Sequence, residues 1–182
     1  MIDLRETMLP NALEVDGEAY MIDTDFRTWI RFQADYEKGL VPFYIFAERP
    51  PKGSFEAQAV QFMANPNSTP RGGESGPKVV DFVEDGEYIV ASFQHAYGID
   101  LTDPDLKMHW HRFKALFDGL PDDTKMGKIE GYRAWRDSAD DHKTVMRKLR
   151  EAWRLPEDGE AEALAEARAI AEALYDMENG GE

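Results

Sequence analysis

The chain is 182 residues long, which predicts one domain, with at most an appendage, and enough residues to bury a sizeable core. Its net charge of −15 argues against a protein that binds nucleic-acid duplexes, since such proteins present a basic face. It contains no cysteine, which excludes disulfides, thiolate metal sites and cysteine nucleophiles, and none of its apolar runs is long enough to span a membrane.

Two short runs near the N-terminus, 12–15 and 18–22, flank the dipeptide Asp16-Gly17. This dipeptide readily adopts positive φ angles and predicts the two-residue turn of a β-hairpin. An isolated hairpin is marginally stable in water, so it is expected to lie on another element.

The first helix is expected directly after the hairpin. Asp23 or Thr24 can cap it, and apolar residues recur at near-helical spacing until Gly39 stops it. The aromatic segment 41–47 fits either a strand or the start of another helix, and the sequence leaves this open.

Ser54 predicts the cap of a second helix over residues 55–64. Proline and glycine are frequent after it and apolar residues are scarce, as in a flexible linker. The predicted division of the chain is a hairpin with helices over 1–64, a linker over 65–80, a helical domain over 81–155 and an acidic C-terminal helix over 156–182.

The second half predicts four helices that are bounded by ordinary cap residues. In chain order they run from Asp81 or Asp85 to Gly98, from Asp103-Pro104 to Gly119, from Asp122 to Trp135, and from Ser138 to Leu155-Pro156. Beyond them, Glu157 to Asn179 predicts a long amphipathic helix with a narrow, alanine-rich seam. The expected fold is mainly α, a helical bundle-like domain with one N-terminal β-hairpin and a C-terminal amphipathic helix.

Charge is distributed unevenly along the chain. The net charge is −11 over residues 1–106, +4 over 107–154 and −8 over 155–182. The acidic C-terminal segment can lie against the basic stretch, or one of the two can await a partner of opposite charge. The final helix can likewise be partly detached, pack on a neighbouring subunit, or be docked on its own domain. The sequence leaves these alternatives open.

Histidine, serine and glycine patterns give no sign of catalysis. His109 and His111 are two residues apart, so on a regular helix they point about 200° away from each other. His95 and His142 lie on other predicted helices. No Gly-x-Ser-x-Gly motif occurs, and no Gly-Lys-Ser/Thr follows the glycines of the linker. We therefore expect no catalytic residue, no metal site and no cofactor, and hence a protein that is not an enzyme.

Large apolar side chains on the predicted helix faces are the candidate partner-binding residues. They are Trp29, Phe32, Trp110, Phe113 and Phe117, together with Ile170 and Leu174 on the final helix. The alternative for each of the five aromatic residues is an ordinary place in the core, and Trp110 fits that alternative best.

A set of sequence blocks resembles one known family. The blocks, in chain order, are Ile22-Asp23-Thr24-Asp25-Phe26-Arg27, Tyr97-Gly98-Ile99-Asp100-Leu101, Met108-His109-Trp110, Leu116-Phe117-Asp118-Gly119-Leu120 and Tyr132-Arg133. Their order and spacing over residues 10–136 are similar to the bacteriophage "gene product fifteen" family of long-tailed phages and prophages. His111 departs from the pattern, because the family more often has a second aromatic residue there.

The resemblance implies a virion-morphogenesis protein of the host cell cytoplasm. The typical gene position of the family implies a tail assembly chaperone, which binds the tape measure protein and assists assembly of the tail tube. The implied partners are the tape measure protein, the major tail protein and further copies of the chain, with neither nucleic acid nor membrane. The alternative is a structural tail completion or connector protein that is retained in the virion.

Overall fold

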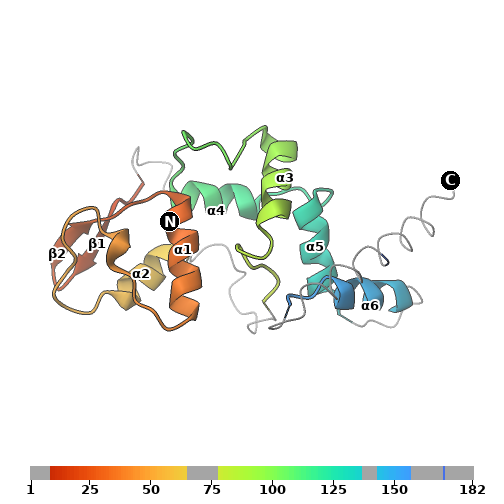
Figure 1. Cartoon of the computed structure of the whole chain (residues 1–182), viewed down its shortest axis with the longest axis horizontal. Helices are drawn as coiled ribbons and strands as arrows, with labels where there is room; N and C mark the ends of the chain where they lie inside the picture. Colours follow the sequence, from red (N-terminus) through yellow and green to blue (C-terminus); the bar gives the residue numbers. More distant parts are fainter. Residues whose placement is uncertain (1–8, 65–77, 137–142, 157–169, 171–182) are drawn as a thin grey trace. The chain divides into compact units, whose positions relative to one another are not determined.

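The computed structural model describes residues 9–64, 78–136, 143–156 and 170 (Figure 1). Within this part of the chain, α-helices and one short 3-10 helix follow a two-stranded hairpin, which confirms the predicted mainly α class. The described residues divide into two compact units. The first unit holds residues 9–64 and 100–119, and the second holds 78–99, 120–136 and 143–156.

The N-terminal hairpin forms as predicted. Strand β1 (Ala12–Val15) pairs antiparallel with β2 (Glu18–Met21), and Val15 lies opposite Glu18. The turn residues Asp16 and Gly17 have φ angles of 52° and 81°, so both adopt the left-handed conformation that a two-residue hairpin turn requires. Leu13 and Val15 share one face of β1 and are buried, and β1 packs against α2 (Glu56–Met63).

Helix α1 (Phe26–Glu37) is capped by neither of the two predicted residues, Asp23 and Thr24. The cap is Asp25, whose carboxylate accepts a hydrogen bond from the Arg27 amide at 3.1 Å. The Asp23 carboxylate instead accepts hydrogen bonds from the Asp25 amide and the Thr28 hydroxyl. The helix ends just before Gly39, as predicted, and Gly39 has a φ angle of 77°.

The segment that the sequence left open, 41–47, forms a short 3-10 helix, η1 (Phe43–Ile45). Phe46 then forms an antiparallel bridge with Ile22, which connects this segment to the end of the hairpin. The predicted Ser54 cap of α2 is wrong, because α2 begins after Phe55 without a side-chain cap. The Ser54 hydroxyl donates to the Glu56 carboxylate instead.

The predicted helix start at Asp103-Pro104 is also wrong. Asp103 opens a turn, in which its carbonyl oxygen accepts a hydrogen bond from the Leu106 amide. The carbonyl oxygens of Leu101, Asp103 and Leu106 all accept hydrogen bonds from the Arg27 guanidinium, at 3.0, 2.7 and 2.9 Å. These carbonyls are therefore directed at a distant side chain, and this tertiary contact outweighs the local preference for a helix start.

Helix α4 (Trp110–Asp118) begins only at its cap His109, after the chain has formed an antiparallel bridge between His109 and Asp25. α4 packs against α1 and thus belongs to the first unit. The sequence predicts one helical domain over residues 81–155. In the structure, residues 100–119 belong to the same unit as the N-terminal residues, because α4 packs against α1.

The second unit contains three helices in its described part. α3 (Gly86–Tyr97) lies between the cap residues Asp85 and Gly98, in agreement with the predicted bounds. Gly98 has a φ angle of 65°. α5 (Lys125–Ala134) is capped by Thr124 and packs against both α3 and α6 (Lys143–Ala152).

Several predictions fall on residues outside the described part of the chain. These are most of the linker (65–77), the Ser138 cap, Leu174 and the C-terminal helix apart from Ile170. They stay predictions.

Candidate functional site

The five aromatic residues predicted to contact a partner form the core of the first unit. Trp29, Phe32, Trp110, Phe113 and Phe117 are at most 6% exposed. The Phe113 ring lies between the rings of Trp110 and Phe117, with centroids 5.7 and 6.2 Å away. The two indoles donate hydrogen bonds to backbone carbonyls, as buried tryptophans usually do. In this structure these side chains stabilise the unit and present no surface to a partner.

Of the two aliphatic candidates, Ile170 is exposed and Leu174 lies outside the described residues.

The two histidines on either side of Trp110 have structural partners. The His109 Nδ1 accepts a hydrogen bond from the His111 amide at 3.0 Å, and its Nε2 lies 2.9 Å from the Pro10 carbonyl oxygen. The His111 Nε2 lies 2.8 Å from the Phe62 carbonyl oxygen, and its ring stacks on the Phe62 ring. In both rings the nitrogen next to a carbonyl must carry the proton, which fixes the neutral tautomer.

Burial lowers the pKa of both His109 and His111 below the usual histidine value. The His111 Nδ1 is buried and has no hydrogen-bond partner among the described residues. Protonation of His109 would remove the acceptor that caps α4, and protonation of His111 would bury an N–H without an acceptor. This pair therefore makes the first unit sensitive to acid.

Among the described residues, no three histidine, aspartate or glutamate side chains are grouped so that they could hold a metal ion. Among the helices of the same residues, none has both the length and the apolar character that crossing a bilayer requires.

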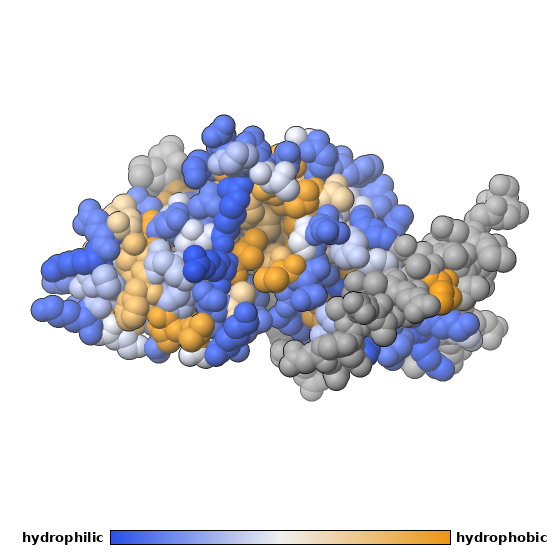
Figure 2. Space-filling view, in the orientation of Figure 1, coloured by the Kyte–Doolittle hydropathy of each residue, from blue (hydrophilic) through white to orange (hydrophobic). Residues whose placement is uncertain are grey.

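The first unit exposes an apolar patch, which we define as Tyr36, Leu40 and Phe43. Their exposed fractions are 40%, 55% and 58%, and all three lie within eight residues, where α1 ends and η1 begins. The Tyr36 ring stacks on the buried Phe32, and the Phe43 ring contacts the buried Phe55. Figure 2 shows hydrophobic residues gathered on the surface of the first unit near the end of α1. The patch is thus held by the core beneath it while its outer surface faces solvent.

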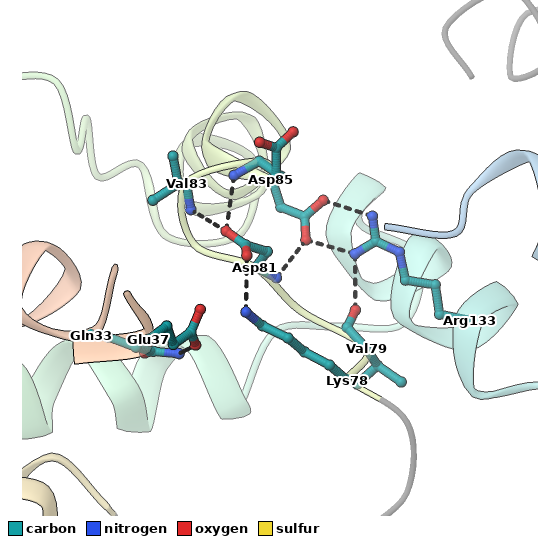
Figure 3. A network of polar contacts seen from close by, with 9 residues as sticks. Gln33, Glu37, Lys78, Val79, Asp81, Val83, Asp85 and Arg133 are labelled. Carbon is teal, nitrogen blue, oxygen red and sulfur yellow. Dashed lines mark hydrogen bonds and ion pairs between the residues drawn. The ribbon is translucent and has the colours of Figure 1, made fainter. Parts of the chain in front are cut away.

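The second unit is organised around a buried ion pair between Asp85 and Arg133 (Figure 3). Two hydrogen bonds of 2.6 and 2.8 Å join the guanidinium to the carboxylate. The same guanidinium donates to the carbonyl oxygens of Val79 and Trp153. Arg133 therefore ties together the segment before α3, the N-terminus of α3 and the end of α6.

A pocket of about 320 Å³, the basic pocket, lies next to this ion pair in the second unit. Its lining consists of five cationic side chains, one acidic side chain and three apolar or aromatic ones: Lys78, Arg133, Arg136, Arg150, Arg154, Glu151, Ala134, Trp135 and Leu155. Such a lining favours an anionic ligand, because guanidinium groups bind carboxylates and phosphates with directed hydrogen bonds.

No local sequence motif predicts the ion pair or the basic pocket. Asp85 and Arg133 are 48 residues apart in the sequence, and each resembles an ordinary polar residue at a helix end. The one signal is the net charge of +4 over 107–154, a stretch that supplies four of the five cations of the pocket. Helix α6 carries the basic residues Lys143, Arg147, Lys148 and Arg150, and of these Arg150 lines the pocket.

The family model described as Bacteriophage Gp15 protein matches residues 31–155, a range that runs from within α1 to just beyond α6 and leaves out the hairpin. No curated protein and no solved structure matches the chain.

Proposed function

Because the chain belongs to the bacteriophage Gp15 protein family, we propose that it is a tail assembly chaperone that binds the tape measure protein before the tail tube forms around it. Membership of the family supports the broader role of a phage structural or morphogenesis protein. The proposed partners are the tape measure protein and the major tail protein, and further copies of the chain can take part. The proposed activity is binding in the host cytoplasm, without catalysis or a cofactor.

The apolar patch is the observation that carries this proposal. A tape measure protein is long, helical and rich in apolar residues, so a protein that keeps it from aggregating needs an exposed apolar surface on a charged body. Tyr36, Leu40 and Phe43 provide such a surface, and two of the three are rigid aromatic rings, which lose little conformational entropy on binding. The net charge of −15 keeps a coated complex dispersed.

Co-expression with the tape measure protein of the same phage tests the proposal. The full chain should raise the soluble recovery of the tape measure protein several-fold. The double variant Leu40→Gln with Phe43→Gln should lose most of this effect. Val83→Gln is the matched control, because Val83 is 62% exposed but lies in the second unit, and this variant should keep the effect.

Two outcomes would contradict the proposal. If the wild-type chain leaves the recovery of the tape measure protein unchanged, the chain is not its chaperone. If the double variant works as well as the wild type while melting at the same temperature, the patch is not the binding surface.

Mass spectrometry of purified virions separates a chaperone from a structural component. A chaperone acts during assembly and should be absent from the finished particle. Stoichiometric presence of the chain in virions would instead favour a tail completion or connector protein, which needs a ring-forming interface between copies.

A further inference from the structure

The basic pocket of the second unit holds more positive charge than its neighbours neutralise. Three of its five cations have carboxylate partners: Arg133 with Asp85, Lys78 with Asp81, and Arg154 with Glu151. Arg136 and Arg150 form no ion pair with any carboxylate of the described residues. Arg150 lies over the ring of Trp135 and is 3.5 Å from its carbonyl oxygen, a long hydrogen bond to an uncharged group. Two guanidinium groups at the pocket are thus available to an anion.

A dense group of carboxylates follows this pocket in the sequence. Leu155 is part of the pocket lining, and Glu157, Asp158, Glu160 and Glu162 follow it within seven residues. A fully extended chain of seven residues spans at most about 25 Å, so the tether to Leu155 limits how far the backbone that carries these four carboxylates can move from the pocket. Tethering of this kind gives an effective concentration in the millimolar range.

We propose that the basic pocket is a carboxylate-binding site and that residues 157–162 of the same chain occupy it, with Arg136 and Arg150 as the principal ligand-binding residues. An acidic peptide fits the chemistry better than a nucleic acid. The chain as a whole carries a net charge of −15, which repels a polyphosphate, whereas the tethered carboxylates are already part of that charge. The guanidinium groups supply paired N–H donors, which match the two oxygens of a carboxylate.

Amide and side-chain NMR of the full chain tests the proposal with two variants of equal charge. The near variant carries Glu157→Gln, Asp158→Asn, Glu160→Gln and Glu162→Gln. The far variant carries Glu172→Gln, Asp176→Asn, Glu178→Gln and Glu182→Gln. Each removes four negative charges, so the change in net charge is the same and only the place of the carboxylates differs.

The readouts are the Arg136 side-chain N–H signal and the Trp135 indole signal, which lie about twenty residues before the substituted segment. The near variant should shift both signals, and the far variant should leave them in place. Sodium chloride at 1 M should move the wild-type signals toward those of the near variant, because salt screens exposed ion pairs. Equal shifts in the two variants, or none in either, would overturn the proposal.

The reverse experiment changes the pocket. In the double variant Arg136→Gln with Arg150→Gln, the carboxyl pKa values of residues 157–162 should rise relative to the wild type, because their cationic partners are gone. Unchanged pKa values would contradict the proposal. A short single-stranded oligonucleotide added to the wild-type chain should not alter the Trp135 indole signal. If it displaces that signal at physiological salt, the pocket is a phosphate site and the proposal is wrong.

Discussion

Replacement of Arg133 by methionine should destabilise the second unit strongly. Arg133 and Asp85 have side chains that are 3% and 1% exposed, so Arg133→Met leaves a carboxylate inside the protein without its counter-charge. The substitution also removes the donor for the carbonyl oxygens of Val79 and Trp153. Methionine has a similar length to the aliphatic part of arginine, so little of the effect comes from lost volume.

The expected loss follows from these contacts. Removal of one partner of a buried ion pair costs about 3–5 kcal/mol. Each carbonyl oxygen that is left without a donor costs roughly a further 1 kcal/mol where water does not replace it. With two such carbonyl oxygens, we expect a loss of about 5–7 kcal/mol in the free energy of unfolding, against a typical total of about 5–15 kcal/mol for a domain.

Hydrogen exchange measured by mass spectrometry resolves the two units and is the appropriate assay. Amides of α3 and α5 should exchange much faster in Arg133→Met, while those of α1 and α4 should keep their rates. Arg31→Met is the matched control, because Arg31 makes a 3.8 Å ion pair with Asp35 at the surface of the first unit. This pair should contribute less than about 1 kcal/mol.

A double variant gives the result that would refute the reasoning. Asp85→Leu with Arg133→Met removes both charges, so the double variant should be more stable than Arg133→Met alone. If the two substitutions add, or if Arg133→Met costs less than about 1 kcal/mol, the pair is not the buried and mutually dependent unit that the structure shows.

Two further effects are expected. Acid should destabilise the first unit, because burial holds the pKa of His109 and His111 in the folded chain below their unfolded value of about 6.5, so the unfolded chain takes up these protons at a higher pH. The free energy of unfolding should therefore fall with decreasing pH by up to about 1.4 kcal/mol per pH unit for each histidine, as urea titrations at pH 7.5 to 5 can measure; a flat profile would contradict this. In α5, Gly127→Ala places a Cβ 2.6 Å from the Pro121 carbonyl oxygen and should lower the melting temperature. A Cβ at position 131 has no described atom within 4 Å, so Gly131→Ala should stabilise the helix by about 0.5–1 kcal/mol. Equal changes in melting temperature for Gly127→Ala and Gly131→Ala would contradict this prediction.

Local sequence signals predicted the elements that local physics controls. The Asp16-Gly17 turn and the Gly98 helix end depend on positive φ angles, and those are properties of the residues themselves. The Asp103-Pro104 signal failed because the Arg27 guanidinium, about 76 residues away in the chain, takes the carbonyl oxygens of that segment. No inspection of the neighbours of Asp103 could reveal that contact.

The candidate sites likewise depend on contacts that local sequence signals do not reveal. Periodicity found the large aromatic residues of α1 and α4, but it cannot tell a face that packs from a face that binds, and these aromatics proved to be buried. Tyr36, Leu40 and Phe43 lie where the helix ends and the period is lost, so the exposed patch had no periodic signal. The basic pocket depends on side chains from three separate segments, which only the fold brings together.

Because α4 belongs to the first unit, that unit cannot be completed until part of the second unit has been synthesised. Phe26 stacks on Phe113 with ring centroids 4.8 Å apart, so the core that starts with α1 is completed only by residues made almost ninety positions later. By then the segment 78–99, which belongs to the second unit, has already been synthesised. During synthesis, segments of the two units therefore appear in alternation. A nascent chain that stops before residue 119 has no finished unit, and a gene cut in two at the proline- and glycine-rich stretch would yield an N-terminal fragment with its aromatic core open to water.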